Sequence, residues 1–221
     1  MASGNMDKNV KRIREKKIIA IIRGLTAEEA VKASRALFEG GIQFMEVTFD
    51  QNSQDHFKNT IEAIINIKND NPEIHIGAGT VMTIEQVEMA INAGAEFIIS
   101  PNVDFEVIKR TKELKALSIP GAFTPSEVTN AYNAGADFVK VFPAGDMSAN
   151  YIKSLKGPLG HIPLLAVGGI DHVNMKDFYK AGCCGFGIGG NLVNKALIRE
   201  EKYDELKKTA ECYVEAAEKL D

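Results

Sequence analysis

Short apolar segments recur along the chain from residue 18 onward, each followed by a turn, a longer amphipathic stretch and a glycine. The segments are rich in Ile, Val and Phe, and several lack the alternation of polar and apolar residues that marks a half-exposed strand. Strands covered by helices on both faces have this character. The pattern therefore predicts eight buried strands, at residues 18–23, 42–49, 73–78, 96–101, 117–122, 137–143, 162–167 and 184–189.

The stretches between these strands carry the signals of helix ends. The segment TPSEVTNAYNAG has Thr124 in the N-cap position, Pro125 at the first helical position and Gly135 at its end. Proline is favoured at the start of a helix and glycine just past its end. The segment that begins at Thr26 repeats the threonine cap and also ends in glycine. Helices are therefore predicted between the strands.

Alternating strands and helices predict an α/β fold, and eight strand–helix units favour a (β/α)8 TIM barrel. A doubly wound open sheet is the alternative. No linker-like stretch divides the chain, so we expect a single domain at residues 1–221. An extra N-terminal helix is predicted at residues 6–17, a last helix near residues 203–219, and disorder at residues 1–5.

An internal repeat supports the barrel. Similar sequences precede the second, fourth, sixth and eighth strands, and their glycines, Gly41, Gly94, Gly135 and Gly182, are 53, 41 and 47 residues apart. Each spacing has the length of two strand–helix units, as expected of a barrel built from repeated pairs.

The repeat also predicts which side chains point inward. Five residues after the four glycines stand Glu46, Ile99, Lys140 and Gly187. Equivalent positions on equivalent strands face the same way, and the interior of such a barrel is layered. If no bulge intervenes, Glu46 and Lys140 face each other across the interior, and Gly187 leaves space beside them.

Composition and charge remove several classes of function. Hydrophobic residues make up 45% of the chain and charged residues 25%, which is typical of a folded globular protein. The net charge of −4 argues against a nucleic-acid partner. The longest apolar run is too short to span a membrane, and the polar N-terminus has no signal-peptide pattern, so a cytoplasmic protein is expected.

The cysteines and histidines predict neither a disulfide framework nor a metal site. Two of the three cysteines, Cys183 and Cys184, are adjacent, and the third, Cys212, is distant. Neither this spacing nor that of the histidines matches a ligand motif. We therefore expect no metal.

Lys140 is the first candidate for chemistry. It lies in the segment DFVKVFP, where Phe138 and Phe142 share its face. A lysine buried among aromatic rings loses hydration as a cation, so its pKa falls and its amine becomes a nucleophile for a carbonyl group. Glu46 would then move protons beside the resulting imine. The alternative is a purely structural ion pair between Lys140 and Glu46.

Arg23 and several strand ends are candidates for binding an anion. Arg23 follows the first strand, and the guanidinium fork suits a carboxylate or phosphate, although a surface arginine is the alternative. Thr80 offers a hydroxyl group at the end of the third strand. Glycine turns that can bind phosphate through backbone N–H groups follow the seventh and eighth strands, at Gly168, Gly169, Gly189 and Gly190.

With these residues the chain resembles the class I aldolases for 2-keto-3-deoxy-6-phosphogluconate (KDPG) and 4-hydroxy-2-oxoglutarate (KHG). The resemblance covers about residues 12–219 and rests on the following motifs, in order: IIAIIRG, GGIQFMEVTF, IGAGTVMT, GAEFIISPN, PGAFTPSE, DFVKVFPA, AVGGI and GIGGNLV. It implies a (β/α)8 barrel and a homotrimer.

The resemblance also implies roles for individual residues. Lys140 would form the Schiff base and Glu46 would be the general acid and base, while Thr80 and an arginine would hold the pyruvate end. Pro101 and Phe142 would be further substrate-binding residues. No metal or organic cofactor is implied.

Two positions depart from the pattern of the family. Asp50 stands where many members have an arginine, so Arg23 is expected to take the anchoring role. Asn191 stands in the turn after the eighth strand, where many members have Ser or Thr.

The expected reaction is the cleavage of a 4-hydroxy-2-oxo acid to pyruvate and an aldehyde, either glyceraldehyde 3-phosphate or glyoxylate. Two alternatives remain at this point. One is another phosphate-binding barrel enzyme, such as a sugar-phosphate epimerase or isomerase. The other is a non-catalytic barrel that serves as a binding module.

Overall fold

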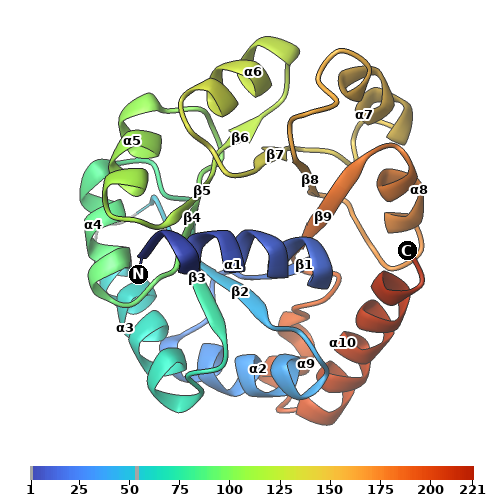
Figure 1. The fold of residues 1–221 in the computed structure, drawn as a ribbon. Helices are drawn as coiled ribbons and strands as arrows, with labels where there is room; N and C mark the ends of the chain where they lie inside the picture. The colour runs from blue at the N-terminus through green and yellow to red at the C-terminus, as the bar shows by residue number, and fades with distance from the viewer. Residues whose placement is uncertain (1, 53–54) are drawn as a thin grey trace.

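All eight apolar segments form strands in the computed structural model, which describes residues 2–52 and 55–221 (Figure 1). Within the described residues the strands are β1 (Ile18–Ile22), β2 (Phe44–Thr48), β3 (His75–Gly79), β4 (Phe97–Ile99), β5 (Leu117–Ile119), β6 (Gly121–Ala122), β7 (Val139–Val141), β8 (Leu164–Val167) and β9 (Cys183–Ile188).

The strands form one parallel sheet that curls into a nearly closed barrel. Its order is β5-β4-β3-β2-β1-β9-β8-β7-β6, so β5 and β6 lie at opposite ends of the order. In the sequence these two strands are separated only by Pro120, which has no N–H group to donate to a strand ladder. Because the order begins and ends at the same place in the chain, the sheet is an α/β barrel and the open-sheet alternative is wrong.

Helices surround this barrel (Figure 1). In the described residues they are α1 (Ala2–Lys16), α2 (Ala27–Glu39), α3 (Asp55–Asp70), α4 (Ile84–Asn92), α5 (Phe105–Glu113), α6 (Pro125–Asn133), α7 (Ala149–Lys156), α8 (Met175–Lys180), α9 (Lys195–Arg199) and α10 (Tyr203–Glu218). The predicted caps are present: Thr26 and Thr124 each form a capping box with the glutamate three residues later.

The N-terminal helix differs from its prediction at both ends. α1 begins at Ala2, four residues earlier than predicted and inside the segment expected to be disordered, since no proline separates that segment from the amphipathic part. Met1 lies outside the described residues. α1 ends at Lys16 because Lys17 adopts a φ of 64°, which a right-handed helix excludes.

α1 lies across one end of the barrel (Figure 1). Since α1 leads directly into β1, this is the end at which the strands start. Ile13 of α1 belongs to a set of buried residues that we call the interior cluster, and Val10 of α1 packs against this set. The interior cluster consists of Ile13, Ile19, Phe44, Phe97, Ile99, Leu117, Ile119, Phe138, Leu165 and Val167. Apolar side chains therefore fill the barrel interior from α1 up to the ends of β4 and β8, where Ile99 and Val167 lie, and the charged groups are left to the opposite end from α1.

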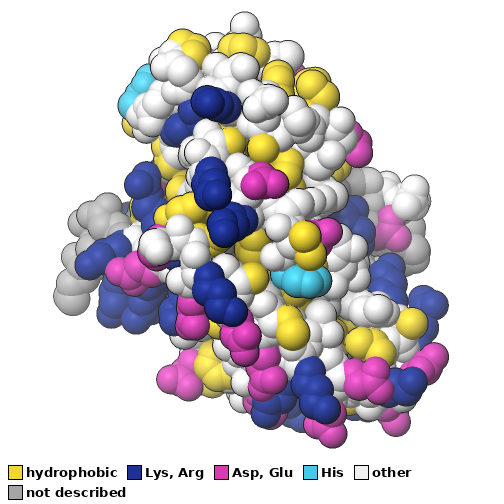
Figure 2. Space-filling model, turned by 90° about the vertical axis from the view of Figure 1, so that its right-hand side faces the viewer, with side chains coloured by type: hydrophobic (Ala, Val, Ile, Leu, Met, Phe, Trp, Pro, Cys, Tyr) yellow, Lys and Arg dark blue, Asp and Glu magenta, His cyan; other side chains and the backbone are white. Residues whose placement is uncertain are grey.

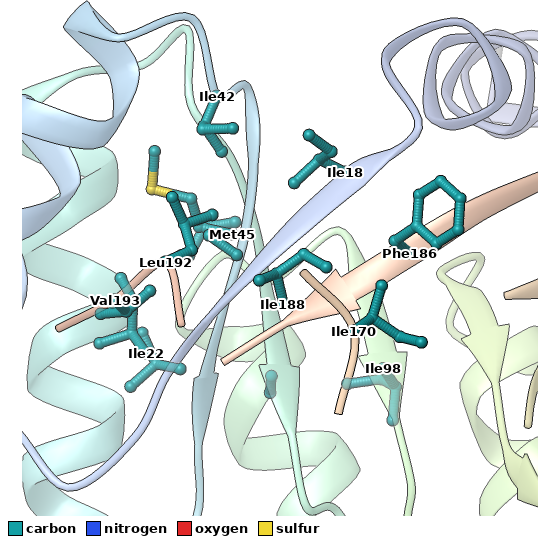
Figure 3. Packing of buried hydrophobic residues seen from close by; sticks show 14 of the residues in the cluster. Ile18, Ile22, Ile42, Met45, Ile98, Ile170, Phe186, Ile188, Leu192 and Val193 are labelled. Carbon is teal, nitrogen blue, oxygen red and sulfur yellow. The ribbon is translucent and has the colours of Figure 1, made fainter. Parts of the chain in front are cut away.

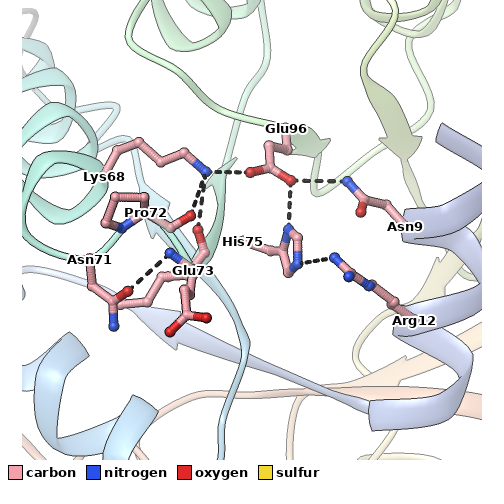
Figure 4. Close-up of polar contacts among 9 residues, drawn as sticks. Asn9, Arg12, Lys68, Asn71, Pro72, Glu73, His75 and Glu96 are labelled. Carbon is pink, nitrogen blue, oxygen red and sulfur yellow. Dashed lines mark hydrogen bonds and ion pairs between the residues drawn. The ribbon is translucent and has the colours of Figure 1, made fainter. Parts of the chain in front are cut away.

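Polar contacts also attach α1 to the barrel (Figure 4). Arg12 donates to His75 Nε2 over 2.9 Å, and His75 Nδ1 donates to Glu96 Oε2 over 2.7 Å. Glu96 also accepts from Asn9 over 2.9 Å and from Lys68 over 2.5 Å. The carboxylate of Glu96 therefore joins α1, α3 and β3.

A second, larger apolar core lies between the strands and the outer helices (Figure 3). Ile22, Met45, Ile98 and Ile188 point outward from their strands and pack against side chains such as Leu192. Alternate residues of each strand thus serve this outer core and the barrel interior, which is why the strands lack polar alternation.

The face formed by α7, α8 and α10 shows lysine and arginine side chains interspersed with aspartate and glutamate (Figure 2). Neither sign of charge dominates this face, in keeping with the net charge of −4. Among the described residues, no helix has the length and apolar character needed to cross a membrane.

Candidate active site

Four side-chain positions predicted to share an interior layer do point into the barrel. Glu46 on β2 and Lys140 on β7 are only 1% and 6% exposed, and Ile99 belongs to the interior cluster. A Cβ at Gly187 would lie 2.8 Å from a methyl group of Val167, another member of that cluster. A register irregularity between β8 and β9 falls earlier in β9, so the alternation at Gly187 is kept.

Burial makes the Lys140 amine a better nucleophile. The loss of hydration lowers its pKa, the charge of Glu46 opposes this shift, and the charge of Arg23 adds to it. The ammonium or amine Nζ lies 4.8 Å from the centroid of the Phe142 ring. The amine is therefore neutral more often than that of an exposed lysine, as a Schiff-base nucleophile requires.

Glu46 has an exceptional environment for a carboxyl group. Its Oε2 is buried and has no hydrogen-bond partner among the described residues. Burial raises the pKa of Glu46, while the charges of Lys140 and Arg23 act to lower it. A Cβ at Gly79 would collide with this carboxyl group, so the glycine in the GAGT motif creates the space that Glu46 occupies. An unsatisfied buried oxygen is costly, which is a feature of functional sites rather than of stable cores.

Arg23 and Thr80 meet at the open end of the barrel. Arg23 Nη2 donates to Thr80 Oγ1 over 3.1 Å. Thr80 has a φ of 56°, a rare conformation for a β-branched residue, which costs about 1–3 kcal/mol. Gln51 Nε2 donates to the Thr80 carbonyl over 2.6 Å, and Gln86 donates to Gln51 over 3.0 Å. These two glutamines hold the strained residue in place.

Sequence reasoning missed Gln51 and Gln86. Their only signal was nearness in sequence to two recognised strand ends, and loop positions have no periodicity that could rank them. Asp50, beside Gln51, accepts hydrogen bonds from the backbone and side chain of Asn52. Asp50, at the position where many members of the family have an arginine, therefore accepts hydrogen bonds within its own loop.

A cavity of about 580 Å³ opens above Lys140. Arg23, Lys140 and Lys195 contribute its charged groups, and the described residues that line it include no aspartate or glutamate. Its wall also contains Phe142, Asn191 and the four predicted glycines, Gly168, Gly169, Gly189 and Gly190. A cavity that carries the charges of Arg23 and Lys195 and has no carboxylate among its described lining residues attracts an anionic ligand.

The two glycine turns in this wall have different physical roles. Gly168 and Gly169 have φ values of 88° and 68°, which other residues adopt only with strain. A Cβ at Gly189 or Gly190 would meet nothing within 4 Å, and neither residue has a positive φ. The first turn needs glycine for its backbone, whereas the second leaves open space on the cavity side.

Not every predicted residue lines this cavity. Thr80 borders a neighbouring cavity of about 710 Å³, which shares Arg23 with the first. Pro101 lines neither, and its carbonyl group is so close to Gly121 that a Cβ there would collide with it. A substrate contact of Pro101 stays a prediction. Among the described residues, no three His, Cys, Asp or Glu side chains are close enough together to hold a metal ion.

A parallel α/β barrel that holds a buried lysine and a buried carboxyl group beneath a cationic cavity has the arrangement of a Schiff-base aldolase, a class I aldehyde-lyase. Comparison with known proteins gives the family. The family model described as KDPG and KHG aldolase matches residues 10–209. The chain belongs to this family.

Individual relatives agree with this assignment. The 2-dehydro-3-deoxy-6-phosphogalactonate aldolase of Escherichia coli (strain K12) is 33% identical over 202 residues, or 91% of this chain and 96% of that protein. The KHG/KDPG aldolase of the same organism is 31% identical over 204 residues, or 90% of this chain and 92% of that protein.

A solved structure of KDPG aldolase from Legionella pneumophila, with pyruvate captured as a covalent carbinolamine intermediate, is also similar. It has a TM-score of 0.78 and 26% identity, and the match covers 90% of this chain and 94% of that one. These matches support neither the epimerase or isomerase alternative nor the non-catalytic barrel.

Proposed function

We propose that this protein cleaves a phosphorylated 2-keto-3-deoxy sugar acid by a reversible retro-aldol reaction, with Lys140 as the Schiff-base residue. The observation that carries the proposal is the pair Lys140 and Glu46, buried in one interior layer beneath a cation-lined cavity. No metal or organic cofactor has a part in this chemistry.

Each step uses a group of the site. The neutral Lys140 amine attacks the C2 ketone, and loss of water with a proton from the Glu46 carboxyl group gives a protonated imine and the Glu46 carboxylate. The Glu46 carboxylate takes the proton of the C4 hydroxyl group, directly or through a water molecule, and its raised pKa makes it a stronger base. The C3–C4 bond breaks, and its electron pair moves toward the imine nitrogen to form an enamine. Glu46 then returns the proton to C3, and hydrolysis releases pyruvate and restores the Lys140 amine.

Different groups of the site would bind the two ends of the substrate, the C1 carboxylate and the phosphate. The charge of Arg23 acts on both Lys140 and Glu46, and Arg23 bonds to Thr80, which supports a role for these two residues in holding the C1 carboxylate next to the reacting ketone. The turns at Gly168–Gly169 and Gly189–Gly190 would hold the phosphate at the other end. The products are then pyruvate and glyceraldehyde 3-phosphate.

The relatives are named for substrates that differ in configuration or in the aldehyde released, namely phosphogalactonate, phosphogluconate and 4-hydroxy-2-oxoglutarate. We choose the phosphorylated compounds because the glycine turns in the cavity can bind a phosphate through backbone N–H groups, whereas cations alone would also attract the second carboxylate of 4-hydroxy-2-oxoglutarate. Initial rates with both phosphorylated C4 epimers decide between phosphogalactonate and phosphogluconate.

Three finer features belong to the same proposal. If β5 and β6 are counted as one strand interrupted at Pro120, the barrel is a (β/α)8 barrel with α1 as an extra helix.

A homotrimer is supported by large apolar side chains exposed on neighbouring elements: Met82 and Ile84 at 42% and Phe105 at 55%. A cytoplasmic location is supported by the three cysteines, all of which are free. Light scattering of the purified protein measures the oligomer.

Reductive trapping tests the central step. Pyruvate and borohydride should leave one three-carbon adduct on the chain, located at Lys140 by peptide mass mapping. Lys17 is an internal control, because it is also buried but forms an ion pair with Asp221 over 2.6 Å. Lys140→Arg should give no adduct and no cleavage, since a guanidinium forms no such imine. An adduct on Lys17, or none on the chain, would contradict the proposal.

A further inference from the structure

We propose that Lys195 binds the phosphate of the substrate and thereby selects phosphorylated over unphosphorylated sugar acids. This inference rests on the proposed function, because it assigns the far end of the same substrate. Lys195 belongs to no motif recognised in the sequence, and only the folded structure shows that it lines the same cavity as Lys140.

The first observation is the place of the Lys195 ammonium group. Lys195 is the first residue of α9 and lines the same cavity of about 580 Å³ as Lys140. Its Nζ would lie 2.8 Å from a Cβ placed on Gly24, so the ammonium group rests against the backbone just beyond β1. It is therefore held at the mouth of the cavity, at the level of the loops and beyond the strand ends.

The second observation is that nothing neutralises this charge. Within the described part of the chain, Lys195 Nζ forms neither a hydrogen bond nor an ion pair, although the chain has 30 acidic residues for 26 basic ones. Two lysines that follow in the sequence are paired: Lys202 with Glu200 over 2.8 Å, and Lys207 with Glu39 over 3.3 Å. An ammonium group that shares a carboxylate-free cavity with Arg23 and Lys140 is available for an anionic ligand.

The third observation separates the tasks of Lys195 and Arg23. Arg23 bonds to Thr80 and is close enough to shift the pKa of Lys140 and of Glu46, which places it at the reacting end of the substrate. Lys195 reaches the same cavity from the start of α9, five residues after Gly190, and the turn of Gly189 and Gly190 leaves open space on the cavity side. A substrate with its C2 atom on Lys140 carries the C1 carboxylate one bond away and the phosphate on C6, four carbons further on.

A purely structural role does not account for this lysine. A positive charge at the first position of a helix is unfavourable for that helix, where acidic residues are preferred. Removal of the charge should therefore leave the melting temperature unchanged or slightly higher. A loss of activity in such a variant then reports binding rather than unfolding.

The test compares Lys195→Gln with Lys208→Gln, which removes the same charge from an exposed position on α10 outside the cavity. For the phosphorylated substrate, Lys195→Gln should lower kcat/KM by about 10- to 100-fold, mainly through KM. For the unphosphorylated sugar acid the change should stay within about twofold, as it should for Lys208→Gln with both substrates. Lys195→Arg should keep most of the activity, because it restores the charge.

Arg23→Ala is the contrasting variant, since it should affect the two sugar acids equally. An equal loss on both sugar acids for Lys195→Gln, or no loss on either, would overturn the proposal. A greater loss on 4-hydroxy-2-oxoglutarate than on the phosphate ester would overturn the choice of phosphate as the ligand.

Direct binding of inorganic phosphate separates this inference from the proposed function. Calorimetric titration should show phosphate binding to the wild type that is about tenfold or more weaker in Lys195→Gln. The pyruvate adduct at Lys140 should form in both proteins. If the adduct forms but phosphate binds equally to both, the role of Lys195 fails alone; if phosphate binding depends on Lys195 but no adduct forms, the proposed function fails alone.

Discussion

At the residue scale, burial acts in opposite directions on the two ionisable groups of the interior layer. It lowers the pKa of Lys140 and raises that of Glu46, and in each case the loss of hydration outweighs the attraction between the two charges. The neutral form of the amine, which can attack a ketone, is thereby favoured, and the carboxyl group is better able to accept and return a proton. A structural ion pair would need both charges to be favoured, which is the opposite of this arrangement.

Replacing the carboxyl group tests that interpretation. Glu46→Gln should reduce turnover by about 10²- to 10⁴-fold, because a placed acid or base contributes roughly that much to proton transfer. The pyruvate imine at Lys140 should still be trapped, since its formation needs only the amine. Single-turnover rates and the trapped mass measure the two effects. Wild-type turnover in this variant would remove Glu46 from the mechanism.

The residues that sequence reasoning identified share one property. Glu46 and Lys140 lie on strands, where a period of two fixes the direction of each side chain, and the repeat relates one strand to another. Gln51, Gln86 and Lys195 lie in loops or at helix starts, where no period applies. Their positions follow only from how the loops fold over the barrel, which no local sequence pattern specifies.

At the element scale, the turns after β8 and β9 contribute to the same cavity in different ways. The turn at Gly168 and Gly169 depends on left-handed backbone conformations, whereas the turn at Gly189 and Gly190 does not. The sequence pattern treated the two glycine pairs as equivalent, because composition does not reveal φ. The distinction makes the second turn a place where a side chain can be added without loss of the fold.

Gly190→Val should therefore leave the melting temperature nearly unchanged and fill part of the cavity. We expect a large fall in kcat/KM for the phosphorylated substrate and a smaller one for 4-hydroxy-2-oxoglutarate. Gly169→Ala is the contrasting variant and should lower stability by about 1 kcal/mol or more, because alanine resists a positive φ. Thermal melts and steady-state kinetics measure both. Equal activity of Gly190→Val on the two substrates would argue against a phosphate site at this turn.

At the scale of the whole molecule, the two ends of the barrel are specialised differently. The end where the strands start is covered by α1, the interior cluster fills the barrel behind it, and the other end is open and carries the charges of Arg23 and Lys195. The amphipathic pattern predicted a helix before β1 but could not say where it would pack. Its place follows from Val10 and Ile13 on one side and the contacts of Asn9 and Arg12 on the other.

The polar contacts between α1 and the barrel depend on one titratable group, the carboxyl group of Glu96, and this predicts how the stability of the whole protein responds to acid. Burial alone would raise the pKa of Glu96, but the hydrogen bonds from His75 and Lys68, together with the charge of Lys68, lower it from 4.5 to about 2. A carboxyl group whose pKa is lower in the folded than in the unfolded state stabilises the fold at pH values above its unfolded pKa. For Glu96 this contribution is lost as the pH falls from about 4.5 toward 2.

Glu96→Gln should therefore be less stable than the wild type at pH 7, and the gap should close as the pH falls to about 2, because the wild-type carboxylate is then protonated as well. Urea unfolding at a series of pH values measures this directly. Glu73→Gln is the matched control: Glu73 is exposed, lies two residues before His75 and forms no ion pair within the described chain, so its removal should leave the profile unchanged. A gap between wild type and Glu96→Gln that stays constant down to that pH would show that the contacts of α1 do not depend on the charge of Glu96.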